Sequence, residues 1–319
     1  MEMEKKRVII DTDPGIDDAL AILLALASPE LQLEALTVVS GNCDAVQGAR
    51  NALGILELAG AGDIPVAQGM RIPLVQEALL APETHGETGM GYASLPSPTR
   101  EVVPQHAVDL LIEMIMAAPG EITLVAIGPL TNVAMAIRRE PRVASAVKET
   151  IIMGGAIREW GNTTPLAEFN TYFDPHAAHI VYHSGMPITL VPLDVTYQAI
   201  LTRADVDRLL TVESPVSHFI ADATRFYMEF HDEYQSIEGC VINDPLALAL
   251  TFAPQLVDTK LLYVDVDIGC GVSMGKTFAD FYRMWNKEPN MKVALGCRAR
   301  DFIELFLQRI EDFCRAHPD

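Results

Sequence analysis

The sequence has no long hydrophobic run and no paired cysteines. Its apolar stretches fall short of the roughly 18 consecutive residues that a transmembrane helix needs. The five cysteines, Cys43, Cys240, Cys270, Cys297 and Cys314, are scattered and include no C-x-x-C pair, which argues against a zinc site or a disulfide framework and is typical of a reducing compartment. Residues 1–7 are charged and lead directly into an apolar segment, so we expect no signal peptide. These absences predict a soluble, cytoplasmic protein without a membrane partner.

Basic residues are also scarce. Lys and Arg together number 23 against 43 Asp and Glu, which gives a formal net charge of −20. So acidic a chain disfavours nucleic acid or an anionic membrane surface as a partner. Half of the 319 residues are hydrophobic, enough for a large core, and we find no internal repeat or shift in composition. We therefore expect residues 1–319 to form one domain.

Strand-like and helix-like segments alternate along most of the chain. Short apolar segments that predict buried strands lie at 8–10, 33–39, 64–67, 122–127, 150–153, 188–191 and 261–266. Helical patterns lie at 45–59, 106–117, 130–138, 175–183, 245–253 and 300–314. Continuously apolar strands that alternate with helices predict an α/β fold, with an open, mainly parallel, Rossmann-like sheet and helices on both faces.

Two stretches do not fit simple strand–helix units. Residues 68–105 are long and rich in Pro and Gly, and residues 226–244 carry several aromatic side chains. Loops this long inside a domain are usually functional lids or disordered. The spacing of Phe226, Tyr227 and Phe230 favours a helix face, whereas His231 and Tyr234 fit a lid and a core equally well.

Four carboxylates crowd one predicted strand-to-helix turn. Asp11 and Asp13 follow the strand at 8–10, and Asp17 and Asp18 open the next helix, so four acids fall within eight residues. Helix capping accounts for one or two of them, but like charges this close cost free energy unless a cation or protons neutralise them. All-oxygen ligands select Ca²⁺ or Mg²⁺ over zinc. The turn therefore predicts a metal site.

Other polar residues follow the ends of later strands. Asn42 comes after the strand at 33–39, and a polar stretch that ends at Asn170 comes after the strand at 150–153. Ligands of parallel α/β sheets bind outside the carboxyl ends of the strands. Glu168 and Asn170 are two residues apart, so we expect both to face one side of an extended segment. The pattern predicts one site shared with the acidic turn.

These residues resemble a known family. The segments D-T-D-P-G-I-D-D-A at 11–19, G-N at 41–42, M-G-G at 153–155, A-E-F-N at 167–170 and D-P at 174–175 resemble, in order and over nearly the full chain, Ca²⁺-dependent nucleoside hydrolases of the inosine–uridine preferring type. The resemblance implies the nucleoside hydrolase fold and hydrolysis of purine or pyrimidine ribonucleosides to free base and ribose. It also suggests a homodimer or homotetramer.

The resemblance further implies roles for individual residues. The metal ligands would be the carboxylates of Asp13, Asp18 and Asp244 and the backbone carbonyl of Ile127. Asp13 would also be the base that takes a proton from a metal-held water, and Asp11 would support the turn. The side chains expected around the ribose are Asp17, Asn42, Asn162, Glu168 and Asn170, with Met153 beneath the sugar. These residue types suit the chemistry, because cleavage of an N-glycosidic bond passes through an oxocarbenium-like state that carboxylates and amides stabilise.

One position departs from the family pattern. Many members carry a histidine immediately before the late D-P, where it protonates the departing base, and here that position is Asn243. An amide has no titratable proton to give near neutral pH. His85 resembles another active-site histidine of the family. It or His231 could supply the proton, or aromatic stacking could make a purine basic enough for solvent to protonate it.

Two alternative functions arise from the same residues. A metal-dependent nucleoside- or ribose-binding protein that has lost turnover would explain Asn243. A haloacid-dehalogenase-like phosphatase would explain a D-x-D after a strand, but it leaves Asn42, Glu168 and Asn170 without a role. The sequence does not specify the preferred base, because the base pocket would lie in the two long stretches.

Overall fold

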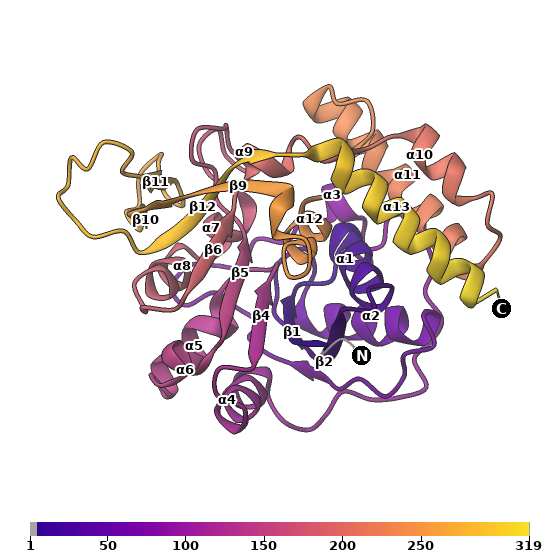
Figure 1. Ribbon diagram of the computed structural model, residues 1–319, viewed down its shortest axis with the longest axis horizontal. Coiled ribbons are helices and arrows are strands. Elements are labelled where there is room, and N and C mark those ends of the chain that lie inside the picture. Colours follow the sequence, from indigo (N-terminus) through magenta and orange to yellow (C-terminus); the bar gives the residue numbers. More distant parts are fainter. Residues whose placement is uncertain (1–4, 319) are drawn as a thin grey trace.

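A central sheet of eight strands carries the candidate site in the computed structural model, which describes residues 5–318 (Figure 1). The strand order is β3-β2-β1-β4-β5-β6-β12-β9, and all neighbours within the described residues run parallel except β12 and β9. This confirms the predicted open, mainly parallel sheet. Its strands are β1 (Lys6–Thr12), β2 (Leu31–Val38), β3 (Val66–Gln68), β4 (Ile122–Ala126), β5 (Glu149–Met153), β6 (Ile188–Val191), β9 (Val257–Leu262) and β12 (Met291–Cys297).

Helices cover both faces of the sheet, and each face has its own hydrophobic core. In Figure 1, α4, α5 and α8 lie on one face and α1, α2 and α13 on the other. Ile9 packs into the first core, whereas Val8 and Ile10 pack into the second, as alternation along a strand requires. The helices are α1 (Ile16–Leu26), α2 (Ala45–Leu58), α3 (Pro82–His85), α4 (Ala107–Ala117), α5 (Thr131–Arg139), α6 (Val143–Ala146), α7 (Phe169–Phe173), α8 (Pro175–Tyr182), α9 (Leu193–Thr196), α10 (Arg203–Leu209), α11 (Pro215–Gln235), α12 (Asn243–Ala249), η1 (Pro254–Leu256) and α13 (Ala299–Ala316).

The structure differs from the prediction toward the end of the chain. The strand predicted at 261–266 is wrong, because β9 ends at Leu262 and β10 (Val264–Val266) pairs with β11 (Thr277–Ala279) in a separate two-stranded sheet. The four central residues of β9 are exposed, so the sequence of this edge strand does not alternate between buried apolar and exposed polar residues. The pattern that predicts strands is therefore missing here. The prediction also lacks β12, which lies between β6 and β9.

The two long stretches have different structures. Residues 68–105 start at the last residue of β3, contain the short helix α3 and otherwise follow an irregular course. Most of the second stretch belongs to α11, which begins with Pro215 after a cap in which Ser214 Oγ accepts from the Ser217 N–H (3.1 Å). The helix interpretation is therefore confirmed. A further small pair of strands, β7 (Ile200–Leu201) and β8 (Cys240–Val241), joins the segments on either side of α10 and α11.

The N-terminal segment enters the sheet early. The expectation of no signal peptide depends on the charged residues 1–7. Residues 1–4 of these lie outside the described residues, and β1 begins at Lys6. Throughout residues 5–318, every helix is too short or too polar to cross a membrane.

The carboxyl ends of four parallel strands meet at one edge of the sheet. Strands β1, β2, β4 and β5 end at Thr12, Val38, Ala126 and Met153. The register pairs Asp11 of β1 with Thr37 of β2 on one side and with Ala126 of β4 on the other. Polar residues that immediately follow these strands are therefore brought together in space.

Candidate active site at the carboxyl edge of the sheet

A pocket at this edge collects residues from distant parts of the chain. The predicted site residues that line it are Asp17, Asn42, His85, Ile127, Met153, Asn162, Glu168, Asn170, His231, Asn243 and Asp244. The other two, Asp13 and Asp18, are buried and accept hydrogen bonds from Asn42 of the pocket wall. The structure thus brings all the predicted site residues into one place.

The acidic turn is held by its own hydrogen bonds. Asp18 is the third residue of α1, and its carboxylate accepts from the backbone N–H groups of Gly15 (3.0 Å) and Asp13 (3.2 Å) and from the Thr12 hydroxyl. This is the capping interaction that acids favour at a helix start. Capping accounts for Asp18 but not for the other acids of the turn.

Buried carboxylates meet at the base of the pocket. Carboxylate oxygens of Asp17, Asp18 and Asp244 lie within 4.8 Å of one another. Asp13 Oδ2 accepts from the Asn42 N–H (2.7 Å), and Asp13 Oδ1 is buried without a hydrogen-bond partner in the described chain. Burial raises the pKa of Asp13 and Asp244 well above the usual value, and neighbouring carboxylates raise it further. A cation would relieve this repulsion, and the cluster can hold a metal ion.

Asp11 lies behind the cluster and joins three elements. Its Oδ1 accepts from the Thr37 hydroxyl of β2 (2.6 Å) and from Asn132 Nδ2 of α5 (2.9 Å). Burial raises the pKa of Asp11 to about 7, although these two hydrogen bonds lower it. These contacts give Asp11 a structural role behind the pocket, which it does not line.

Amide side chains connect the pocket walls to the backbone. Asn42 Nδ2 donates to Asp18 Oδ2 (2.9 Å), and Asn170 Nδ2 donates to the Ile127 carbonyl (2.8 Å) and to the Met153 carbonyl (3.3 Å). The ends of β4 and β5 and the start of α7 are therefore tied together. The Ile127 carbonyl itself faces this network rather than a strand partner.

The local structure around Glu168 differs from the prediction. The extended segment expected around Glu168 and Asn170 is wrong, because Glu168 is the N-cap of helix α7. Its Oε2 accepts from the Gly155 N–H and its Oε1 from the Asn170 N–H, both at 2.7 Å. Asn162 lies exposed at the rim, where its Oδ1 accepts from the Phe169 N–H (2.8 Å). These residues nevertheless share the pocket.

Two histidines with opposite hydrogen-bonding roles form part of the outer wall. His85 Nδ1 accepts from the Ile16 N–H (3.1 Å), so the neutral ring carries its proton on Nε2. His231 Nδ1 lies 2.7 Å from the Tyr227 carbonyl oxygen, which only accepts, so its proton is on Nδ1 and Nε2 is an acceptor. Burial lowers the pKa of each ring to about 4. Both are neutral near pH 7.

Sequence reasoning assigned no site role to Tyr227. Its ring lies between the two histidines, with centroids 5.3 Å from His85 and 4.4 Å from His231, and its hydroxyl donates to Asp17 Oδ2 (3.3 Å). Asn243 Nδ2 also donates to Asp17 Oδ2 (3.0 Å). The spacing of four residues between Tyr227 and His231 on a helix was the available signal, since such residues share a face.

Residues 8–304 match the family model described as inosine-uridine preferring nucleoside hydrolase. The chain belongs to this nucleoside hydrolase family. Among curated relatives, the pyrimidine-specific ribonucleoside hydrolase RihA of Enterobacter sp. (strain 638) is 38% identical over 307 residues, which are 96% of this chain and 98% of RihA. The resemblance seen in the sequence motifs is therefore confirmed.

Solved structures of nucleoside hydrolases share the fold. A purine-preferring ribonucleoside hydrolase from Gardnerella vaginalis superposes with a TM-score of 0.93 at 33% identity, covering 98% of this chain and 100% of that one. The plant nucleoside hydrolase PpNRh1 has a TM-score of 0.93 at 36% identity, with 97% and 99% covered. This nucleoside hydrolase is thus an enzyme that hydrolyses ribonucleosides, and the phosphatase alternative has no support.

Proposed function

We propose that the enzyme cleaves the N-glycosidic bond of ribonucleosides with Asp13 as the base that accepts a proton from the attacking water. The observation that carries this assignment is the free carboxylate oxygen of Asp13. Oδ1 is buried and unpartnered among residues 5–318, while Oδ2 is held by the Asn42 N–H (2.7 Å). One oxygen thus orients the group and the other is free to accept a proton.

We propose Ca²⁺ as the metal, held by the carboxylates of Asp13, Asp18 and Asp244 and by the Ile127 carbonyl. All four groups are oxygen donors from buried residues, and a hard cation of flexible coordination suits such a set. When bound, the ion would supply an oriented water of lowered pKa and ligation for ribose hydroxyls. Asp17 also belongs to the carboxylate cluster, and its bonds from Asn243 and Tyr227 direct it toward the pocket as a partner for the ribose.

The remaining polar residues are proposed to hold the sugar. Asn42, Glu168 and Asn170 are buried and have hydrogen-bonding atoms at the pocket wall, and Met153 supplies an apolar surface at the end of β5. Asn162 lies exposed at the rim, and we propose that its amide contacts the ribose from there. Amide and carboxylate oxygens here favour the positive charge that develops on the sugar.

The departing nucleobase requires a hydrogen-bond donor. Of the two pocket histidines, His85 has the tautomer that can donate. Its Nδ1 is occupied by the Ile16 N–H, so Nε2–H is the donor of the ring. His231 offers an acceptor instead, because its proton is directed at the Tyr227 carbonyl. Asn243 directs its amide group at Asp17. We propose that neutral His85 donates a hydrogen bond to the base, and that His231 accepts one from it.

We propose that the chain is a single cytoplasmic domain that forms a homodimer or homotetramer. Both hydrophobic cores share the central sheet, which supports one domain. Several apolar side chains on the segment between β10 and β12 are exposed, and a second copy of the chain would cover them. They are Ile268, Val272, Phe278, Tyr282, Met284 and Trp285. Analytical ultracentrifugation of wild type and Y282E/M284E measures the oligomeric state. We expect wild type to be a dimer or tetramer and the variant to dissociate, and a monomeric wild type would contradict the proposed oligomer.

The experiment that tests the reaction is release of ribose from inosine, adenosine, guanosine, uridine and cytidine. Both base classes are needed because one named relative is pyrimidine-specific and another is purine-preferring. Wild type and Asp13→Asn are compared with and without a chelator. We expect multiple turnovers by wild type with metal and a loss on the order of 10³-fold or more in the variant. Ribose binding without turnover would instead identify a binding protein.

A further inference from the structure

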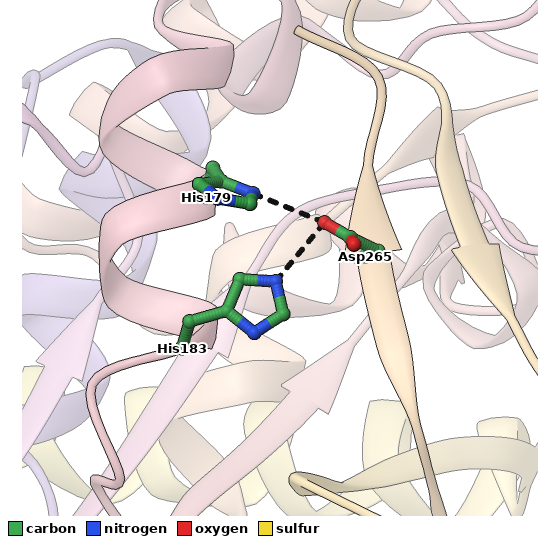
Figure 2. Close-up of side chains that lie close together, drawn as sticks. All are labelled: His179, His183 and Asp265. Atoms are coloured by element: carbon green, nitrogen blue, oxygen red, sulfur yellow. Dashed lines mark hydrogen bonds and ion pairs between the residues drawn. The ribbon is translucent and has the colours of Figure 1, made fainter. Parts of the chain in front are cut away.

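A second cluster of metal-binding side chains lies outside the active site (Figure 2). His179 is in α8 and His183 follows at its C-terminal cap, one turn later, so the two rings lie on one side of the helix. Figure 2 shows both rings directed at Asp265 of β10. His179 Nδ1 and His183 Nε2 each lie 3.1 Å from Asp265 Oδ1.

We propose that His179, His183 and Asp265 bind one divalent transition-metal ion, for which Zn²⁺ is the probe. Two imidazoles and one carboxylate form a ligand set that zinc and other divalent first-row transition metals accept. The active-site cluster differs, because it offers oxygen ligands only. Ligand atoms about 2.0–2.1 Å from a tetrahedral ion are roughly 3.3 Å apart. The two observed nitrogen–oxygen separations of 3.1 Å are close to that value, and all three ligand atoms lie within 4.8 Å of one another.

The carboxylate is held in place by groups that are not ligands. Asp265 Oδ1 accepts from the Val266 N–H (2.9 Å), and Asp265 Oδ2 accepts from the Tyr263 hydroxyl (3.2 Å). Lys287 Nζ donates to that hydroxyl at 2.7 Å. Such partners orient a metal ligand before the ion arrives and typically change affinity 10- to 100-fold. All three ligands are partly exposed, so water can enter and complete the coordination.

The ion would add a link between α8 and a segment that reaches the rest of the protein through a small set of other polar contacts. The segment 263–290 carries β10 and β11 and projects from the sheet (Figure 1). Beyond the cluster, Asn290 Nδ2 donates to the Tyr182 carbonyl of α8 (2.9 Å) and Lys276 Nζ donates to the Ala156 carbonyl (2.8 Å). Gly275 also packs against Tyr172, close to the A-E-F-N segment. A metal at His179 and Asp265 would therefore strengthen the attachment of this segment to α8. The expected consequence is higher stability of the segment rather than a change in the chemical step.

The test titrates Zn²⁺ into the full-length enzyme in excess Ca²⁺, with calorimetry for stoichiometry. Co²⁺ is titrated in parallel, since its visible absorption reports nitrogen ligation. The H179Q/H183Q variant is compared with wild type and with His218→Gln, a control that alters an exposed histidine on α11. We expect wild type and the control to bind one Zn²⁺ per chain. The double variant should bind Zn²⁺ on the order of 100-fold more weakly. Ribonucleoside turnover should be the same in all three proteins.

Two results would overturn the proposal. One is zinc binding by H179Q/H183Q that equals wild type, and the other is no zinc binding by wild type in excess Ca²⁺. If the double variant does not fold, Asp265→Asn replaces it, because both histidines remain and the side chain keeps its size. This variant should bind Zn²⁺ at least about 10-fold more weakly than wild type, and equal affinity would count against the site.

Discussion

Gly41 lies directly against the carboxylate of Asp13. A Cβ atom at Gly41 would fall 2.7 Å from Asp13 Cγ, and one at Gly128 would fall 2.6 Å from Asp13 Oδ1. Neither glycine has a positive φ, so the requirement is for space and not for backbone freedom. The two glycines, which follow β2 and β4, leave room for this one carboxylate and determine where it lies.

Gly41→Ala should therefore lower turnover by on the order of 100-fold, because the methyl group displaces Asp13 from the reacting water by a fraction of an ångström or more. The measurement is kcat for ribose release with saturating metal. Gly271→Ala is the matched control, since a Cβ there meets no atom within 4 Å. Equal activity of the two variants would show that the position of the Asp13 carboxylate does not depend on the absence of a side chain at Gly41.

His85→Ala should reduce hydrolysis of natural nucleosides by roughly 10- to 100-fold, the worth of one hydrogen bond to a developing charge. A ribose with an activated leaving group needs no such donor, so its hydrolysis should fall much less. The ratio of kcat/KM for the two substrates is the readout, with His218→Ala as control. Equal losses on both substrates would remove His85 from the leaving-group role.

His231 should make the fold sensitive to mild acid. Burial lowers its folded-state pKa from 6.5 to about 4, so between these values the unfolded chain binds a proton that the folded protein does not. Stability then falls as pH falls from 6.5 toward 4, by up to about 1.4 kcal/mol per pH unit. His231→Gln should flatten this part of the curve of unfolding free energy against pH. A variant curve parallel to wild type would contradict the assignment.

Removal of the active-site metal should destabilise the enzyme. The carboxylates of Asp17, Asp18 and Asp244 lie within 4.8 Å of one another, and without a cation they repel. At a metal concentration about 100-fold above Kd, binding contributes about 2.7 kcal/mol. Differential scanning fluorimetry with and without a chelator measures this, and re-addition of Ca²⁺ should restore Tm. Asp244→Asn should abolish most of the response, and a chelator-independent Tm in wild type would exclude a bound ion.

Much of the fold and site is readable from local sequence. The acidic turn is predictable because its apolar strand, its Pro14-Gly15 turn and its crowded charges are all contained in one short segment. Likewise, Asn42 and Asn170 follow apolar strands, and parallel strands bring such positions to one edge. These inferences need only local pattern and one topological rule.

Other features depend on contacts between distant residues. Glu168 begins a five-residue helix that is too short to show a period, so its extended appearance in the sequence misleads. The opposite tautomers of His85 and His231 arise from the Ile16 N–H and the Tyr227 carbonyl, and no sequence pattern specifies these partners. The pairing of His179 with Asp265 joins positions 86 residues apart.

The position of β12 imposes an order on biosynthesis. Strand β9 pairs in the central sheet with β12, which lies between it and β6, although β12 is made after β9. On the ribosome, β9 and the projecting segment that follows it must therefore wait until residues 291–297 have emerged. Until then the edge of β6 stays open to pairing with another nascent chain. Insertion of β12, the last strand made, covers this edge of β6.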